Sequence, residues 1–231
     1  MTKIHKLWEV TKQTALDISS SGQAWQKFLS SAAYTSKYIF AEQVSIYAYK
    51  PEAKACASME FWNKVFHRWV NKGAKGIPLP DFSENNSKIN YVFDISDTHE
   101  TRYTNREVDI WRYSDNYEEA LKEILDVQET EFNIDLVDNI KRHIGALVED
   151  LNDELVIDTG EINLKKAKIL KFTKNSTIYM MFERMGLEPS EYFSDSDFSD
   201  ITDFNNLNVL SSIGTLASKI VTNFIEDIKE R

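Results

Sequence analysis

RWVNKGAKGIPLPDF, residues 68–82, interrupts a chain that otherwise has a helical pattern, and it decides the fold class. Gly73 and Gly76 can adopt the positive φ angles that a tight turn needs. Pro78 and Pro80 have no backbone N–H, so they restrict the second arm to an edge strand. The stretch therefore predicts a β-hairpin.

A further strand is predicted directly after this hairpin. Residues 89–96 alternate between two sets of side chains, and a period of two residues is typical of a strand. The more apolar set is Ile89, Tyr91, Phe93 and Ile95, and the other set is Asn90, Val92, Asp94 and Ser96.

Helical spacing dominates on both sides of these strands. Trp25, Phe28 and Leu29 recur at i, i+3 and i+4, and Pro51 ends the helix that precedes it. After about residue 113, two apolar stripes predict helices that face a core. The stripes are Val137, Ile140, Ile144, Leu147, Val148 and Leu151, and then Leu210, Ile213, Ala217, Ile220, Val221, Phe224 and Ile228.

We therefore expect an α+β protein of two domains. Residues 1–112 would form a helix-rich N-terminal domain with a small antiparallel sheet or β-hairpin. Residues 113–231 would form an all-helical acidic module.

The net charge of −10 is unevenly distributed along the chain. Residues 1–80 hold 11 of the 27 basic and 5 of the 37 acidic side chains, a balance of +6, so the remainder carries −16. The first third is therefore suited to a polyanion that the chain as a whole would repel. The alternative is that the two parts dock on each other and neutralise their charges.

No pattern of catalytic or metal-binding residues is found in the sequence. HETRY at 99–103 has Tyr103 where a helical zinc-protease motif needs its second histidine. Asp94, Asp97 and Glu100 could hold a divalent cation, but carboxylates at the end of a strand more often cap it or are solvated. We expect no enzyme, no cofactor and no metal site.

Three further features bound the environment of the chain. The acidic residues 194–205 lack the ordered spacing and the glycine of a calcium loop, so they predict a solvated loop. The single cysteine, Cys56, reads as a small core residue in a reducing cytoplasm. No apolar run approaches the ~20 residues that cross a bilayer, so we expect a cytoplasmic protein without membrane contact.

The chemistry of the 68–82 stretch points to nucleic acid. Glycine turns let a backbone approach phosphates closely, and Arg68, Lys72 and Lys75 supply positive charge. Aromatic faces on which bases can stack lie in the same basic third. These aromatic residues are Tyr34, Tyr38, Tyr49 and Trp69.

The competing interpretation is structural. Tyr38 and Trp69 would belong to the core, which we favour for Trp69, and the lysines would only keep an edge strand soluble. The core interpretation is also favoured for Phe40, Phe61, Trp62 and Phe66.

Three blocks of residues, in order between positions 37 and 98, carry a family resemblance. The blocks are Tyr38, Phe40, Gln43 and Ile46, then Arg68, Val70, Lys72, Gly73, Lys75, Gly76 and Ile77, and then Val92, Phe93, Asp94, Ser96 and Thr98. This region resembles the single-stranded-DNA-binding N-terminal domain of ArdC-type antirestriction proteins, whose relatives are found in phages and conjugative elements. The resemblance implies sequence-independent binding of single-stranded DNA during transfer or protection of a mobile genetic element.

The resemblance and the charge of the hairpin together give a candidate binding surface. Its residues are Tyr38, Gln43, Tyr49, Lys64, Arg68, Lys72, Gly73, Lys75 and Gly76.

The later part of the chain, including STIYMMFERMGLEPSEYF at 176–193, resembles large multidomain proteins of Gram-positive conjugative elements. In those proteins helicase-like and methyltransferase-like regions follow, which implies such domains as partners in a longer chain. The alternative function is a protein-interaction module, in which the acidic helical half docks a basic partner or mimics DNA.

Overall fold

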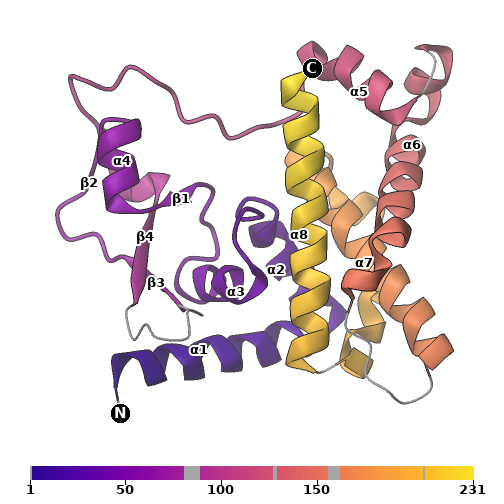
Figure 1. Cartoon of the computed structure of the whole chain (residues 1–231), viewed down its shortest axis with the longest axis horizontal. Helices are drawn as coiled ribbons and strands as arrows, with labels where there is room; N and C mark the ends of the chain where they lie inside the picture. Colours follow the sequence, from indigo (N-terminus) through magenta and orange to yellow (C-terminus); the bar gives the residue numbers. More distant parts are fainter. Residues whose placement is uncertain (1, 81–88, 127–128, 156–161, 205) are drawn as a thin grey trace.

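The computed structural model describes residues 2–80, 89–126, 129–155, 162–204 and 206–231, which form a helical body beside a small unit of strands (Figure 1). The helices of the body are α1 (Lys3–Ile18), α2 (Gly22–Ala32), α3 (Phe40–Tyr49), α5 (Glu118–Leu125), α6 (Glu129–Asp150), α7 (Ile162–Met185) and α8 (Leu207–Glu230). The small unit consists of β1 (Cys56–Ala57), α4 (Met59–Val65), β2 (Arg68–Val70), β3 (Ile77–Leu79), β4 (Asn90–Asp94) and β5 (Thr98–Glu100).

Short 3₁₀ helices connect these elements. They are η1 (Ile95–Asp97), η2 (Asp115–Tyr117), η3 (Asn152–Glu154), η4 (Pro189–Glu191) and η5 (Asp195–Phe204). The expected α+β class, helix-rich with small antiparallel sheets, is confirmed. Within the described ranges, no helix has both the length and the apolar character needed to cross a bilayer.

The helical body is built on the two predicted apolar stripes. Every member of the α8 stripe is buried, and the α6 stripe is buried or packs at the edge of the same cluster. The Asn206 side chain begins α8 by accepting from the backbone N–H of Asn208. In the same way Ser21 begins α2, its hydroxyl accepting from the Ala24 N–H at 3.1 Å.

Helices from both ends of the chain share one core. Trp25 of α2 is fully buried, and its indole Nε1 donates to the Ser176 Oγ of α7 at 2.9 Å. Its ring centroid lies 5.5 Å from that of Phe172, also on α7. The division of the chain between residues 112 and 113 stays a prediction, and the main apolar cluster contains residues from both sides of it.

The acidic segment at 194–204 is not the solvated loop that its composition predicts; residue 205 lies outside the described residues. It forms η5, which buries Phe198, Ile201 and Phe204 against the body. The prediction was wrong because an apolar residue at every third position matches the three-residue turn of a 3₁₀ helix. The carboxylates face outward, where Asp200 and Asp203 both pair with Lys168.

The small unit contains two antiparallel sheets. The first has the order β1–β4–β3, and the second pairs β2 with β5. The predicted hairpin is therefore wrong in its pairing, since its first arm joins β5 and its second arm joins β4. Local turn chemistry indicated a bend correctly but did not identify the later strand that each arm meets.

The strand predicted within residues 89–96 is observed as β4, and its side chains alternate between two faces. Val92 and Asp94 are buried, whereas Tyr91 is 46% exposed. Val92 packs in a second apolar cluster that also contains Cys56 and Ile77, so the expected core position of Cys56 is confirmed. Burial raises the pKa of the Cys56 thiol to about 12.

Helix α3 lies between the helical body and the small unit and contacts both. Its Phe40 ring packs directly against Gly214 of α8, where a Cβ atom would overlap the ring. Farther along α3, Ser45 donates from its hydroxyl to the Pro78 carbonyl of β3 at 2.6 Å. Helix α3 therefore fixes the position of the small unit on the body.

Candidate functional site

A sharp turn at residues 71–76, which we call the basic turn, connects β2 to β3. Its bend closes with a hydrogen bond from the Ala74 N–H to the Asn71 carbonyl at 3.0 Å. Gly73 has a φ of 89°, which confirms the positive φ predicted there. Lys72 and Lys75 are exposed, and neither forms an ion pair with any residue that the structure describes.

Gly76 has a different role from the one predicted. Its φ is not positive, but a Cβ atom at this position would lie 3.1 Å from side-chain atoms of Tyr91 and Phe93. The glycine therefore lets the end of the basic turn pack against the exposed ring of Tyr91. Tyr91 was not among the predicted site residues, because the sequence analysis did not identify which side chains of its strand would be exposed.

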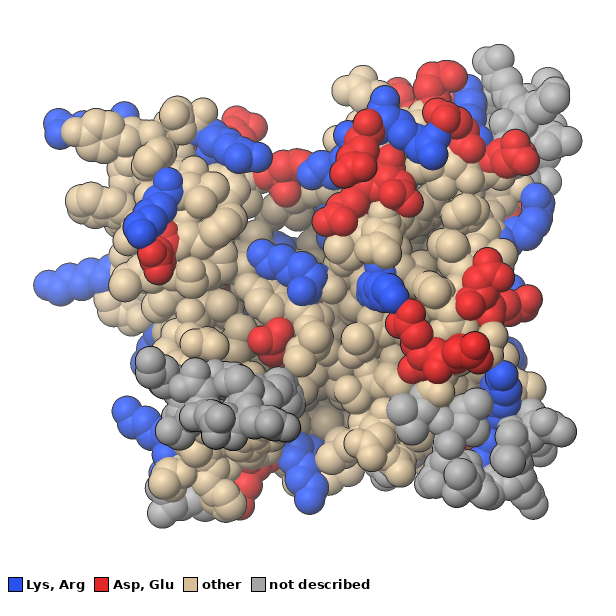
Figure 2. Space-filling model, in the orientation of Figure 1, with Lys and Arg blue, Asp and Glu red and all other residues tan. Residues whose placement is uncertain are grey.

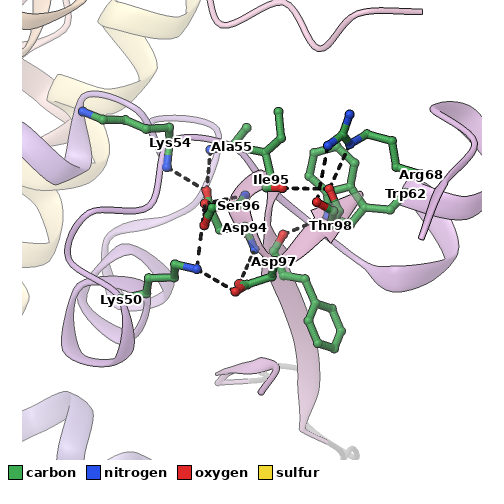
Figure 3. Close-up of polar contacts among 11 residues, drawn as sticks. Lys50, Lys54, Ala55, Trp62, Arg68, Asp94, Ile95, Ser96, Asp97 and Thr98 are labelled. Atoms are coloured by element: carbon green, nitrogen blue, oxygen red, sulfur yellow. Dashed lines mark hydrogen bonds and ion pairs between the residues drawn. The ribbon is translucent and has the colours of Figure 1, made fainter. Parts of the chain in front are cut away.

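A buried carboxylate holds the end of β4 to the loop before β1 (Figure 3). Asp94 is 2% exposed. Its Oδ1 accepts from the backbone N–H groups of Lys54 and Ala55 at 2.8 and 2.9 Å. Its Oδ2 accepts from the Ser96 N–H at 3.0 Å and from the Ser96 hydroxyl at 2.6 Å. Both oxygens are thus used by donors of the protein.

The pKa of Asp94 reflects this arrangement. Burial alone would raise it, but the hydrogen bonds from Ser96, Ala55 and Lys54 stabilise the carboxylate and hold the pKa below its ordinary value. Asp94 is a capping group, as the sequence favoured over a metal ligand. No cluster of metal-ligating side chains occurs among the residues with described positions.

The hydrogen bonds of Asp94 to Lys54, Ala55 and Ser96 form what we call the Asp94 brace. Asp97 connects this brace to the basic turn. Its Oδ1 accepts from Lys50 Nζ at 2.7 Å (Figure 3), and its backbone carbonyl accepts from the Asn71 N–H at 2.8 Å. The first residue of the basic turn is therefore anchored to a buried polar network. A turn that is fixed in this way presents its lysines without a large loss of backbone entropy on binding.

Arg68 is the one predicted cation of the turn region that is engaged by its own fold. Its Nε donates to Thr98 Oγ1 at 2.9 Å and its Nη1 pairs with Glu100 at 3.0 Å. The side chain is only 13% exposed. Arg68 therefore links β2 to β5, and its donors are largely occupied.

Trp69 was expected in the core, and this expectation is wrong. The side chain is 59% exposed. It stands opposite His99 in the β2–β5 ribbon, and the Nδ1 atom of His99 lies 2.7 Å from Asn71 Oδ1. A two-stranded ribbon can bury only one face, and that face is taken by Arg68, Val70 and Thr98.

Tyr38 and Gln43 are engaged in hydrogen bonds within the fold. The Tyr38 hydroxyl donates to the Cys56 carbonyl at 2.8 Å, and burial raises the pKa of this phenol. Gln43 is 1% exposed, and its amide donates to the Thr35 carbonyl and to Ser218 Oγ, both at 3.0 Å. The assignment of Gln43 to a binding surface is therefore corrected: its amide joins α3 to α8.

The other predicted aromatic and basic residues divide in a similar way. Tyr49 is 49% exposed at the end of α3, and Lys64 is exposed on α4 but pairs with Glu60 at 2.6 Å. Trp62 is buried as expected, whereas Phe61 is 44% exposed, which corrects its expected core position.

The charge asymmetry of the sequence is also visible on the surface. In Figure 2, Asp and Glu side chains gather over the helical body on the right, while Lys and Arg side chains predominate on the small unit on the left. Comparison with protein-family models, curated proteins and solved structures finds no match to this chain.

Proposed function

We propose that this chain binds single-stranded DNA without sequence preference, and that the basic turn and the rings beside it form the contact surface. The observation that carries the proposal is a short path of exposed groups: Trp69, Lys72, Lys75 and Tyr91. Two aromatic faces thus flank two cations that have no carboxylate partner among the described residues. Aromatic rings beside cations are what a flexible strand of bases and phosphates needs.

The absence of sequence preference follows from the chemistry of the path. Lysine ammonium groups contact phosphates, which are the same at every nucleotide. Every base has a flat face that can stack on an aromatic ring, at ~1–3 kcal/mol per base. Duplex DNA hides these faces inside its stack, so we expect a preference for single strands.

The biological setting belongs to the same proposal. The ArdC-type resemblance of residues 37–98 suggests that the strand is the transferred DNA of a mobile element, in transfer or in antirestriction. Helicase-like or methyltransferase-like domains of a longer chain would then act on the DNA that this part holds.

The test is a titration of a labelled twenty-nucleotide thymidine strand, followed by fluorescence anisotropy at two salt concentrations. Replacing Lys72 and Lys75 with Ala should weaken binding and reduce the slope of log affinity against log salt by ~0.7 per lost phosphate contact. The control replaces Lys165 and Lys171 of α7, which are exposed and carry the same charge. It should leave both quantities unchanged, and a turn variant that behaves like the control would overturn the proposal.

A protein-interaction module is the second candidate, favoured by the carboxylates that gather on the helical body in Figure 2. In this alternative the acidic half docks a basic partner or mimics DNA. It predicts that the wild-type chain binds a polylysine peptide with an affinity that falls with salt, and that it leaves labelled oligonucleotides free.

A further inference from the structure

A separate cleft of about 270 Å³ lies between the small unit and the helical body. One side is formed by Ala55, by β1 and by α4. The other side is formed by residues 106–109 and by Lys229 in the last turn of α8. Residues 106–109 belong to the segment that runs from β5 across to the helical body (Figure 1). This cleft shares no residue with the basic turn.

The floor of the cleft is aromatic. The ring centroids of Phe61 and Phe66 lie 5.8 Å apart, and those of Trp62 and Phe66 lie 5.5 Å apart. Phe61 is 44% exposed, although it lies on a helix that buries Trp62 beside it. An apolar ring that is left open in a cleft is a platform on which another flat group can stack.

Two cations line the cleft beside this floor. The Arg106 guanidinium lies 5.6 Å from the centre of the Phe66 ring. Lys37 also lines the cleft, and neither cation has a carboxylate partner among the described residues. The Lys37 residue as a whole is exposed. The protein atoms around its ammonium group nevertheless lower the pKa of that group by desolvation.

The carboxylates of the cleft offset these cations only in part. Asp109 pairs with Lys229 at 2.6 Å, so these two charges compensate each other. Glu107 remains, against the two charges of Lys37 and Arg106. The balance favours an anion, and the floor favours a flat aromatic group.

We propose that this cleft binds one nucleotide, with its base on the exposed Phe61 ring and its phosphate between Lys37 and Arg106. The shared chemistry is an aromatic base that carries a phosphate, supplied either by a strand or by a free nucleotide. In the first case the inference rests on the proposed function, and the cleft is a second contact along the strand. Because both the small unit and the body line the cleft, the bound nucleotide also bridges them.

The experiment compares a Phe61→Ala variant and a Lys37→Ala, Arg106→Ala double variant with the wild type and with Met59→Ala. Met59 is 53% exposed on the same helix and does not line the cleft, so it is the matched control. The probes are the labelled twenty-nucleotide thymidine strand, thymidine monophosphate, thymidine and inorganic phosphate. Binding of the small probes is followed by NMR at the Trp62 indole N–H, and thermal melting verifies that each variant folds.

With the strand, Phe61→Ala should lower the affinity about tenfold at an unchanged salt slope, which is the signature of a lost stacking contact. The double variant should lower both the affinity and the slope. Thymidine monophosphate should shift the Trp62 signal more than thymidine or phosphate does, and this shift should be lost in both cleft variants.

The outcomes separate the two proposals. If the wild type binds the strand, the cleft variants bind it as tightly as Met59→Ala does, and thymidine monophosphate gives no shift that these variants lose, the cleft proposal is overturned while the proposed function stands. If the wild type binds no strand, the proposed function fails, and the mononucleotide shift alone decides the cleft. A shift that the cleft variants lose supports a free-nucleotide site, and a missing shift overturns it.

Discussion

Trp62 and Trp69 lie on neighbouring elements of the small unit and have opposite surroundings. Trp62 is 1% exposed, and its indole donates to the Phe93 carbonyl at 2.8 Å. Trp69 is 59% exposed on the outer face of a two-stranded ribbon. At this scale the environment of a side chain, not its type, separates a stabilising residue from a contact residue.

Alanine substitutions of Trp62 and Trp69 should differ in their effect on the free energy of unfolding. We expect Trp62→Ala to lower the free energy of unfolding by ~3–5 kcal/mol, because it opens a cavity and leaves a carbonyl unpaired. Trp69→Ala should change it by no more than about 0.5 kcal/mol. Urea denaturation followed by circular dichroism measures both. A loss for Trp69→Ala comparable with that of Trp62→Ala would contradict the exposed position of Trp69.

At the scale of elements, the sequence predicted helices better than strands. The α8 stripe was readable because each of its apolar residues meets the same core. The alternation at 89–96 predicted a strand that is observed as β4, but it did not identify the buried face, where backbone donors satisfy Asp94. Hydrophobic alternation carries no information on such donors. The pairing of β2 with β5 was unpredictable for a related reason, since strands of three residues contain too few side chains to specify a partner.

The candidate site was predictable to a similar extent. The basic turn followed from its glycines and lysines, and Gly73 has the predicted backbone conformation. The sequence could not predict that Tyr91 lies beside the basic turn, or that the side chains of Arg68 and Gln43 are engaged by the fold and not by a ligand. Each of these positions depends on a residue far away in the chain. Gln43 meets Ser218 and Arg68 meets Thr98.

Because of the Asp94 brace, the free energy of unfolding should depend on pH in the acid range. The folded pKa of Asp94 lies below its ordinary value of 3.8, so its stabilising contribution is complete above that pH and is lost as the pH falls through the folded pKa. Asp94→Asn should therefore lower the free energy of unfolding at pH 5. The difference between wild type and variant should narrow towards pH 2.5.

Urea midpoints at pH 5, 4, 3 and 2.5 provide the measurement. Asp153→Asn, which replaces an exposed carboxylate, is the control and should stay close to the wild type throughout. A difference for Asp94→Asn that keeps its size from pH 5 to pH 2.5 would show that the charge of Asp94 is not what stabilises the brace.

At the scale of the whole molecule, the crossing of α3 and α8 determines where the small unit lies on the helical body. Gly214 lets the Phe40 ring lie against the α8 backbone, and Gln43 donates to Ser218 one turn further along α8. The same α3 helix bonds to β3 through Ser45. A single crossing thus joins the unit that bears the basic turn to the body that bears most of the acidic charge.

Gly214→Ala tests this crossing. The added methyl group would overlap the Phe40 ring, so we expect a loss of ~1–3 kcal/mol in the free energy of unfolding. Gly145→Ala in α6 is the matched helical control. Its Cβ meets only the far end of the Lys174 side chain, at 2.8 Å from Nζ, and that side chain can move away.

The control should be neutral or gain up to about 1 kcal/mol, since alanine favours the helix over glycine. The urea denaturation midpoints of Gly214→Ala and Gly145→Ala are measured beside that of the wild type. Equal effects of the two substitutions would mean that α3 does not pack on α8 as closely as described.

The burial of Cys56 has a kinetic consequence. A thiol reacts with a disulfide reagent only as the thiolate, and a pKa of about 12 together with 1% exposure leaves the folded state almost none that a reagent can reach. Modification must therefore wait until the apolar cluster around Cys56 opens. Where reclosing is faster than reaction, the observed rate equals the rate of a free thiol multiplied by the fraction of open molecules. Cys56 is the only cysteine of the chain. The rate at which its thiol is modified therefore reports the fraction of molecules in which the small unit is open, and the protein needs no added label.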